Sequence, residues 1–399
     1  DEGATVCCLQ KEDHVYSQGS GISAVIKGKS TKAGLARWRS RWMQVNDWRV
    51  NPELFDYYID HSEESVSFIV KKGLEVGSEP TEHTTSSGVV FPNGEVAATF
   101  WVRTPSNQTH MSAIAEQCEQ QGAVFHYSTP AVQLVQDADG TVTGVIGKTA
   151  EGDYIKVNAT KGVILCAGDY MNNTSMLKRY NGDTLDLYPD VVNETGDGHI
   201  LGTLAGGRIA PAPHPRQIHS AWSTDGLLLD TPLLALDTAG KRFMNEECVM
   251  TEWNTILKYH YPFGEPEFLY RIVDSAIEDK YPGTATVADM ERVVGETNPD
   301  VPFGYGRAVF KADTIEELCA LMKIEDAQVV ENVKQSIERY NELCAAGVDE
   351  DFGKAGEFLQ TIDTPPFYGI VNNPESNSAD NGGLLVDAHY QVVDANKSP

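Results

Sequence analysis

The region from residue 123 to residue 168 constrains the fold most, because its hydrophobic pattern is strand-like throughout. Five β-rich runs follow one another here, and Asp139-Gly140 between two of them is a strong hairpin signal. The last run, GVILCAG at 162–168, is continuously apolar and ends in small residues. Strands buried on both faces of a sheet have this composition, and ligands bind beyond the carboxyl ends of such strands. We therefore expect an α/β fold in which a β-meander leads into a buried strand.

The remaining pattern is dominated by helices. Residues 52–74 and 326–347 repeat apolar side chains at helical intervals, and Gly347 suits the end of the second helix. The pattern from about 247 to 360 is mostly helical, and β-type residues return at 367–370. A β-rich region that is interrupted by a helical block predicts a discontinuous domain that carries an inserted one.

The charge of the chain excludes two classes of partner. Its 58 acidic and 31 basic residues give a formal net charge of −27, which opposes binding to nucleic acid and to anionic lipid. No window approaches the ~20 consecutive apolar residues of a membrane span, and the chain does not open on a signal-peptide pattern. We expect no nucleic-acid partner and no membrane span, while a bacterial cytoplasmic location and an exported one both stay open.

Several catalytic and metal-binding motifs do not occur in the sequence. The seven cysteines are scattered without a C-x-x-C pair, and no H-E-x-x-H is present, so we expect neither a disulfide framework nor a metal site. The sequence also has no G-x-S-x-G and no Walker A loop, which removes support for a hydrolase or a P-loop enzyme.

Six segments, in order along nearly the whole chain, match one family pattern: GATVCCLQK (3–11), SQGSGISAV (17–25), the β-rich region with its strand end (128–170), ETGDGHILGTLAGG (194–207), DTAGKRFMNE (237–246) and ERYNELCAAGVDEDFGKAGEFLQTIDTPPFYG (338–369). Together they resemble the FAD-binding family of the fumarate reductase and succinate dehydrogenase flavoproteins, particularly its soluble bacterial reductases. The last segment is the most specific of the six.

The resemblance implies a Rossmann-like FAD-binding domain with a β-meander, interrupted by a mostly helical capping domain. The FAD-binding domain would comprise 1–215 and 362–399, and the capping domain 216–361. The family's opening strand with its G-x-G-x-x-G turn has no counterpart in the sequence, and neither has its C-terminal segment with a catalytic Arg. We therefore expect a family member that lacks both ends, in an α/β fold with an α+β insert.

The resemblance also implies the cofactor, FAD, and the residues that would hold it. Gln10 stands where the family has an acidic residue that binds the adenosine ribose, and Lys11 follows it as in the family. Asp169 stands where the family usually has a second Gly, and Asp197 falls at a helix-capping position in TGDG. The implied cofactor-binding residues are Gln10, Lys11, Gln18, Gly19, Ser20, Gly21, Ala131, Val132, Ala167, Gly168, Asp169 and Asp197.

The substrate-binding positions depart from the fumarate reductase pattern. Counted from the motifs, its substrate-binding Arg and His-His pair fall on Met250 and on Ser378-Ala379. Met cannot donate a proton, and Ser or Ala cannot bind a carboxylate as His does. We therefore expect a substrate other than fumarate, larger and less charged, such as an enone. The catalytic candidates are His214 and Tyr368, and further pocket candidates are His219, Trp222 and Trp253.

Three functions remain open at this point. The first is FAD-dependent reduction of an activated C=C bond, of enone or acrylate type, by hydride transfer from flavin N5, with a small-molecule substrate and a separate electron donor. The second is the reverse reaction, ring dehydrogenation of a ketosteroid. The third is a non-catalytic binding relic of the family, which the substitutions at the substrate-binding positions would favour.

Overall fold

The computed structural model describes residues 3–16, 21–77, 79–84, 98–104, 107–220, 228, 231–260, 268–282, 285–295, 309–372, 374–396 and 398–399. The α-helices are α1 (Lys32–Val45), α2 (Pro52–Glu75), α3 (Asn107–Gln120), α4 (Thr174–Tyr180), α5 (Asp197–Leu204), α6 (Met250–His260), α7 (Ile277–Lys280), α8 (Val287–Val293), α9 (Ile315–Leu321) and α10 (Ala327–Ala346). Short 3-10 helices are η1 (Lys27–Lys29), η2 (Gly182–Thr184) and η3 (Gly356–Phe358).

Within the described residues, the strands form five small sheets. The strand orders in the sheets are β1-β5, β10-β15-β9, β11-β12-β14-β13, β2-β4-β3 and β6-β7-β8. The pairs β1–β5 and β9–β15 are parallel, and all other pairs in these sheets are antiparallel. The strands are β1 (Cys7–Leu9), β2 (Gly21–Val25), β3 (Glu79–Thr84), β4 (Ala98–Thr104), β5 (Val124–His126), β6 (Ala131–Gln136), β7 (Val142–Lys148), β8 (Tyr154–Asn158), β9 (Tyr188–Pro189), β10 (Arg216–Ser220), β11 (Leu234–Leu236), β12 (Leu269–Asp274), β13 (Val309–Ala312), β14 (Phe367–Asn372) and β15 (Pro374–Asp380).

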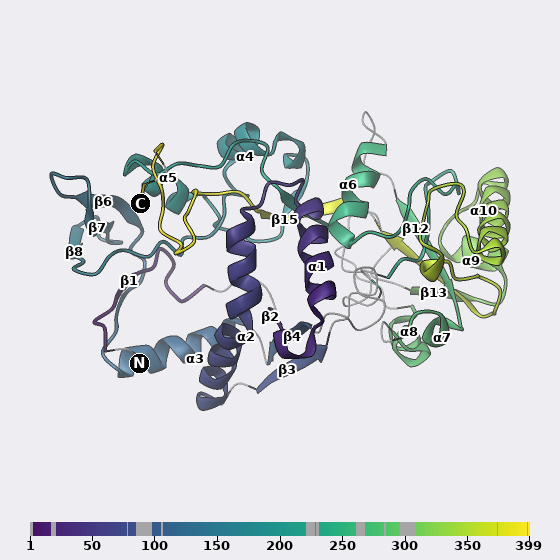
Figure 1. Ribbon diagram of the computed structural model, residues 1–399, viewed down its shortest axis with the longest axis horizontal. Coiled ribbons are helices and arrows are strands. Elements are labelled where there is room, and N and C mark those ends of the chain that lie inside the picture. The colour runs from purple at the N-terminus through teal and green to yellow at the C-terminus, as the bar shows by residue number, and fades with distance from the viewer. Residues whose placement is uncertain are drawn as a thin grey trace.

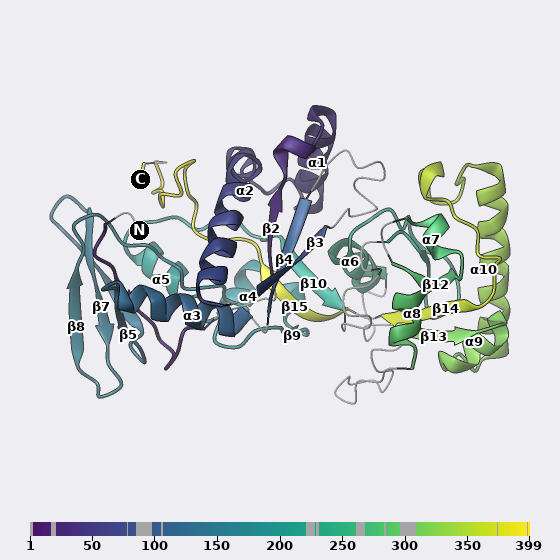
Figure 2. The same cartoon turned by 90° about the horizontal axis from the view of Figure 1, so that it is seen from below.

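These elements lie along one long axis (Figure 1). The meander β6-β7-β8 is at one end, and α9 and α10 with the sheet around β12 are at the other, while α1 and α2 stand between them. Figure 2, turned by 90°, shows the same order along the axis.

The predicted meander is confirmed. β6, β7 and β8 pair in sequence as antiparallel neighbours, and the turn between the first two contains Gly140 with φ 89°. A positive φ is easily adopted only by glycine, which is why Asp139-Gly140 signals a hairpin.

The prediction of a buried strand at 162–168 is wrong. These residues form no strand, and Ile164 is 87% exposed. A strand exists only through hydrogen bonds to a neighbour, and no strand of the described residues pairs with this run. Its apolar composition therefore does not by itself make it a buried strand.

The two long helices predicted from periodicity are confirmed as α2 and α10. Asp326 caps the start of α10 by accepting from the backbone N–H groups of Gln328 and Val329, and Gly347 ends it with φ 68°. One face of α10 is buried, with Val333 and Tyr340 packed in a core that also includes residues of α9 and of the sheet β11-β12-β14-β13.

The capping region is less helical than expected, because a four-stranded antiparallel sheet forms its centre. All six residues of β12 are buried, so this strand lies inside the core and shows no alternation in sequence. The division into 1–215 with 362–399 and 216–361 stays a prediction. Strand pairing favours boundaries a few residues later, because β10 pairs with β15, whereas β14 pairs with β12 and β13.

Candidate functional site

Lys11 joins two of the predicted cofactor segments. It follows β1, and its Nζ lies 3.0 Å from Oδ2 of Asp197 and 2.9 Å from Oγ1 of Thr195, and also donates to the carbonyl of Asn193. The carboxyl end of β1 and the turn before α5 are therefore held together by one ammonium group. The structure brings together Lys11 and Asp197, two of the residues that the resemblance implies.

Asp197 does not occupy the expected capping position. The N-cap of α5 is Gly196, with φ 77°, and Asp197 is the first residue of the helix. The turn requires a positive φ immediately before the helix, and this conformation favours glycine. The Asp197 carboxylate is instead engaged by Lys11, at the positive end of the helix dipole.

Gln10 lies at the end of β1 with an amide group that fits a ribose. Its Oε1 accepts from the backbone N–H of Glu12 at 3.1 Å, and its Nε2 has no hydrogen-bond partner among the residues that the structure describes. An Nε2 group in a half-buried position can donate to a sugar hydroxyl. The binding of the FAD adenosine by Gln10 stays a prediction.

The meander packs closely against this strand end. A Cβ on Gly147 of β7 would lie 2.8 Å from Cγ2 of Thr129 and 3.0 Å from Cδ1 of Leu9, so only glycine allows this approach. Ala131 and Val132 open β6 at the same place, and Val132 is 41% exposed. Both predicted adenine-side residues therefore lie near the end of β1.

The loop after residue 167 is hydrogen-bonded to the turn before α5. The backbone N–H of Gly196 donates to the carbonyl of Asp169 at 2.9 Å, and the backbone N–H of Asp169 donates to the carboxylate of Glu194. Gly168 has φ 70°, and a Cβ there would collide with the same carboxylate. Ala167 contacts this region too, since a Cβ on Gly198 would lie 3.0 Å from Cβ of Ala167.

Asp169 is half-buried among other acidic groups. Its Oδ2 accepts from the backbone N–H of Asp380 at 2.6 Å, at the end of β15. Burial, together with the nearby carboxylates of Asp380 and Glu194, raises the pKa of Asp169 to about 7. The side chain therefore titrates in the neutral range.

The remaining predicted cofactor residues lie partly outside the described part of the chain. Gln18, Gly19 and Ser20 are not among the described residues. Gly21, expected in a loop, is the first residue of β2 and pairs with Val102 of β4.

His214 is part of a buried cluster of polar and aromatic side chains. It is 1% exposed; its Nδ1 lies 2.6 Å from the hydroxyl of Tyr170, and its Nε2 lies 2.9 Å from the carbonyl of Ala210. The ring stacks on Tyr180 at a centroid distance of 4.5 Å. The catalytic role of His214 stays a prediction, and this packing favours a positioning role.

Tyr368 lies on another sheet. It is fully buried in β14, and its hydroxyl donates to Oε1 of Glu291 at 2.6 Å. Burial and this carboxylate raise the pKa of the phenol above its ordinary value. Among the described residues, no hydrogen bond or ring contact joins Tyr368 to His214, so the two catalytic candidates do not form one cluster here.

The predicted substrate-side positions come from neighbouring elements. Met250 opens α6, which packs against β10 and β15, and β15 carries Ser378 and Ala379. The Asn254 side chain fixes this packing by donating to the carbonyl of Ile218 at 3.0 Å. Trp253, a pocket candidate, is 2% exposed beneath the guanidinium of Arg271.

The last two pocket candidates are His219 and Trp222. His219 lies on β10, and its Nδ1 is 3.5 Å from Oδ2 of Asp190, so the structure gives it an acidic partner. Trp222 is outside the described residues.

Two residues of the site were not singled out by sequence. Glu194 joins the loop after residue 167 to the turn before α5 by accepting from the backbone N–H of Asp169. The sequence signal for this residue was its position at the start of the ETGDG motif. His199, in the same motif, contacts Tyr170 edge-on at 5.4 Å, and its buried Nδ1 has no hydrogen-bond partner among the described residues. Burial lowers the pKa of His199, so the ring is neutral at pH 7.

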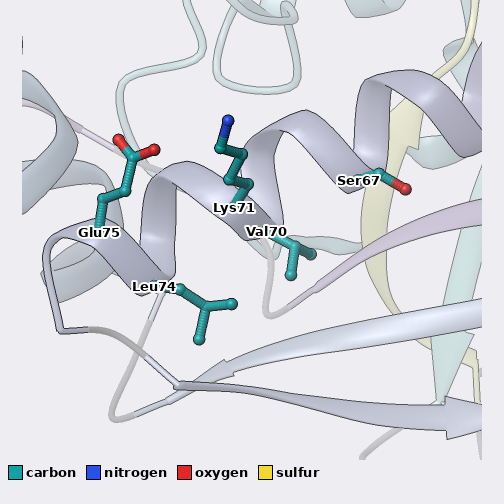
Figure 3. A pocket seen from close by; sticks show the side chains of 5 residues that line it. All are labelled: Ser67, Val70, Lys71, Leu74 and Glu75. Carbon is teal, nitrogen blue, oxygen red and sulfur yellow. The ribbon is translucent and has the colours of Figure 1, made fainter.

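A separate hollow lies along α2 and contains none of the predicted site residues (Figure 3). Val70 and Leu74 point to one side of the helix, while Lys71 and Glu75 point to the other. Within the described ranges, no group of three His, Cys, Asp or Glu side chains is arranged to hold a metal ion. No helix in those ranges is long and apolar enough to span a membrane.

The parallel pair β1–β5, the meander and the turn at 194–197 are parts of one mixed α/β fold, which Lys11 and the close approach at Gly147 hold together. The chain belongs to the FAD binding domain family, whose model matches residues 1–399. The recognition of the family and of its cofactor, FAD, is thereby confirmed.

The curated relatives are flavin oxidoreductases. Vinyl phenol reductase from Lactiplantibacillus plantarum is 27% identical over 437 residues, which cover 100% of this chain and 83% of that protein. Urocanate reductase from Eggerthella lenta is 26% identical over 283 residues, which cover 68% of this chain and 43% of that protein. The chain thus spans less than half of the second relative.

Solved structures show the same fold. The 3-ketosteroid-Δ4-(5α)-dehydrogenase from Rhodococcus jostii superposes with a TM-score of 0.66 at 18% identity, covering 100% of this chain and 84% of that one. A flavocytochrome c3 fumarate reductase gives a TM-score of 0.58 at 17% identity, covering 99% of this chain and 71% of that one. The expected mixed α/β class is confirmed.

Proposed function

We propose that this protein is an FAD-dependent oxidoreductase that reduces an activated C=C bond, of enone or acrylate-ester type, in an uncharged substrate. The observation that carries the proposal is the match of the entire chain to a vinyl phenol reductase, within a family of FAD-binding domains. An NADH:acrylate oxidoreductase from Vibrio harveyi, 23% identical over 86% of this chain, supports the same reaction class.

Bound FAD, once reduced by a separate electron donor, would supply a hydride to one carbon of the double bond. The residues of this chain hold and orient it. In the proposal, Gln10 donates to the ribose, and Lys11 keeps the turn at 194–197 against the end of β1. The second carbon receives a proton, so that one C=C bond becomes a CH–CH bond. Tyr368 is the proposed proton source, and His214, the other catalytic candidate, is proposed to position the site because both of its ring nitrogens are engaged.

The uncharged substrate follows from the residue types at the substrate side. Met250, Ser378 and Ala379 occupy α6 and β15, which pack against each other. None of these side chains carries a positive charge, so a dicarboxylate such as fumarate has no counter-ion there. A neutral alkene conjugated to a carbonyl or an aryl group suits these positions better.

The test is an anaerobic assay on the purified chain with added FAD. An absorption band near ~450 nm that bleaches with dithionite reports a bound, reducible flavin. Reduced methyl viologen then serves as electron donor for 4-vinylphenol, cyclohexenone, methyl acrylate and fumarate. We expect oxidation of the dye with at least one uncharged alkene and none with fumarate. A bound flavin that turns over fumarate alone contradicts the proposed substrate class.

Ring dehydrogenation is a second candidate. A 3-oxosteroid 1-dehydrogenase from Mycolicibacterium smegmatis is 27% identical over 64% of this chain. The same preparation with an oxidised dye and 4-androstene-3,17-dione distinguishes the two, because only a dehydrogenase reduces the dye. A chain that binds no flavin in either assay supports the non-catalytic alternative.

A further inference from the structure

Asp169 is hydrogen-bonded in two directions. Its backbone faces the turn before α5, with its N–H donating to Glu194 and its carbonyl accepting from Gly196 at 2.9 Å. Its carboxylate faces β15, where Oδ2 accepts from the backbone N–H of Asp380 at 2.6 Å. Oδ1 accepts from the backbone N–H of Tyr170 at 2.6 Å, which fixes the side-chain orientation.

The two segments that Asp169 joins have different tasks in the proposed function. The turn at 194–197 is bound to Lys11 at the end of β1, on the cofactor side. β15 carries the substrate-side positions Ser378 and Ala379 and pairs with β10. Asp169 therefore bridges the two sides, with its backbone bonded to the turn on the cofactor side and its carboxylate bonded to β15 on the substrate side. A glycine, which the family resemblance leads us to expect here, has no side chain that could reach β15.

The side chain of Asp169 is also surrounded by ionisable groups. Glu194 and Asp380 face Asp169, and Asp380 is itself held by amide groups of Asn181 and Asn377. The other groups facing this cluster are Lys11, paired with Asp197, and His214, Tyr170, Tyr180 and Asp183 near Asp380 and Asp169. With no cation in direct contact among the described residues, ionised Asp169 lies among like charges.

We propose that Asp169 is a positioning residue that couples the cofactor-binding turn at 194–197 to strand β15, so that FAD binding orders the substrate side. The coupling rests on the proposed function for its meaning in catalysis, but it is measurable without turnover. FAD carries a negatively charged pyrophosphate, and ionisation of Asp169 adds a negative charge to the linked segments. Affinity for FAD therefore falls as pH rises through the neutral range.

The experiment combines hydrogen–deuterium exchange with FAD titration on the full chain. In the wild type, FAD is expected to slow exchange both at 194–197 and in β15. In Asp169→Ala, protection of the turn remains, protection of β15 is lost, and the Kd for FAD rises about fivefold or more, as expected for a broken coupling. Asp139→Asn is the matched control, because this exposed acid sits in a hairpin turn where Asn is equally suitable.

Asp169→Asn keeps one carbonyl oxygen, which can accept from the backbone N–H of Asp380, but it cannot ionise and no longer accepts from the backbone N–H of Tyr170. Its Kd for FAD is expected to be the same at pH 6 and pH 8, whereas that of the wild type rises at least about threefold. If Asp169→Ala fails to fold, the pH dependence of FAD binding in Asp169→Asn tests the inference instead. FAD that leaves β15 unprotected in the wild type, protection of β15 that persists in Asp169→Ala, or a pH dependence that persists in Asp169→Asn overturns the inference.

Failure of the proposed function gives a different result. If FAD protects β15 through Asp169 while no alkene oxidises the reduced dye, the coupling stands and the proposed reaction falls. If an alkene is reduced while β15 is unaffected by FAD, the reaction stands and the coupling falls.

Discussion

The hydroxyl of Tyr170 lies 2.6 Å from Nδ1 of His214, and both side chains are buried. The other ring nitrogen of His214 lies 2.9 Å from the carbonyl of Ala210, so both nitrogens have partners. A Cβ on Gly382 would collide with the ring, which places the histidine against the loop that follows β15. His214 is thus packed between the Tyr170 loop and the end of β15.

Replacing His214 by Phe is expected to reduce stability more than catalysis. The change removes both hydrogen bonds and leaves buried groups unpaired, which costs about 2–3 kcal/mol, whereas Tyr170→Phe costs about 1 kcal/mol. Urea unfolding measures both values, and the turnover number with saturating FAD provides the comparison. A fall of about 100-fold in turnover with an unchanged free energy of unfolding would identify His214 as a direct proton donor.

Arg242 organises the cap through two buried carboxylates. Its guanidinium donates to Glu246 at 2.8 and 2.9 Å and to Asp349 at 3.0 and 2.7 Å, and it lies over the ring of Tyr340. Arg242→Met leaves both carboxylates without this partner, so we expect a loss of about 3–5 kcal/mol in the free energy of unfolding.

The exposed pair of Arg39 with Asp56, at 2.6 Å, is the control for this prediction. Arg39→Met should change the free energy of unfolding by no more than about 1 kcal/mol, because solvent screens the pair. Similar losses in the free energy of unfolding of Arg242→Met and Arg39→Met would show that burial does not strengthen the Arg242 network.

Asp169 also predicts how stability depends on pH. Its pKa is raised from 3.8 to about 7, mainly by burial, so the folded state keeps a proton that the unfolded state releases between these values. The contribution of Asp169 to the free energy of unfolding therefore falls as pH rises from about 4 to 7, by up to about 1.4 kcal/mol per pH unit. Asp169→Asn should reduce this slope in urea titrations between pH 4 and 7, and an unchanged slope would contradict the assignment.

Local pattern was enough to predict the elements whose signals are contained in one segment. The meander and α10 were predicted because turn glycines and helical periodicity lie within the element itself. The run at 162–168 was misread because strand formation depends on a partner, which composition does not specify. The cap sheet was missed for the same reason, since β12 pairs with β14, far along the chain.

The site shows the same limit. The contact between Lys11 and Asp197 spans 186 residues, and only the family resemblance pointed to it. His199, in α5, was passed over because a single histidine without a partner at a suitable spacing does not predict a ligand. The pairing of Asp169 with the Asp380 amide was unpredictable from the sequence, because it depends on where β15 ends in space.

Lys11 provides the most direct test of the cofactor site. Its ammonium group contacts Thr195 and Asp197 and so connects the end of β1 to the turn before α5. Lys11→Met removes these contacts, each worth about 0.5–1.5 kcal/mol, so the Kd for FAD should rise about tenfold, as followed by quenching of flavin fluorescence. Lys161→Met, at an exposed lysine after β8, should leave the Kd unchanged. Equal affinities for the wild type and Lys11→Met would place the FAD site away from this turn, and with it the other residues proposed to hold the cofactor.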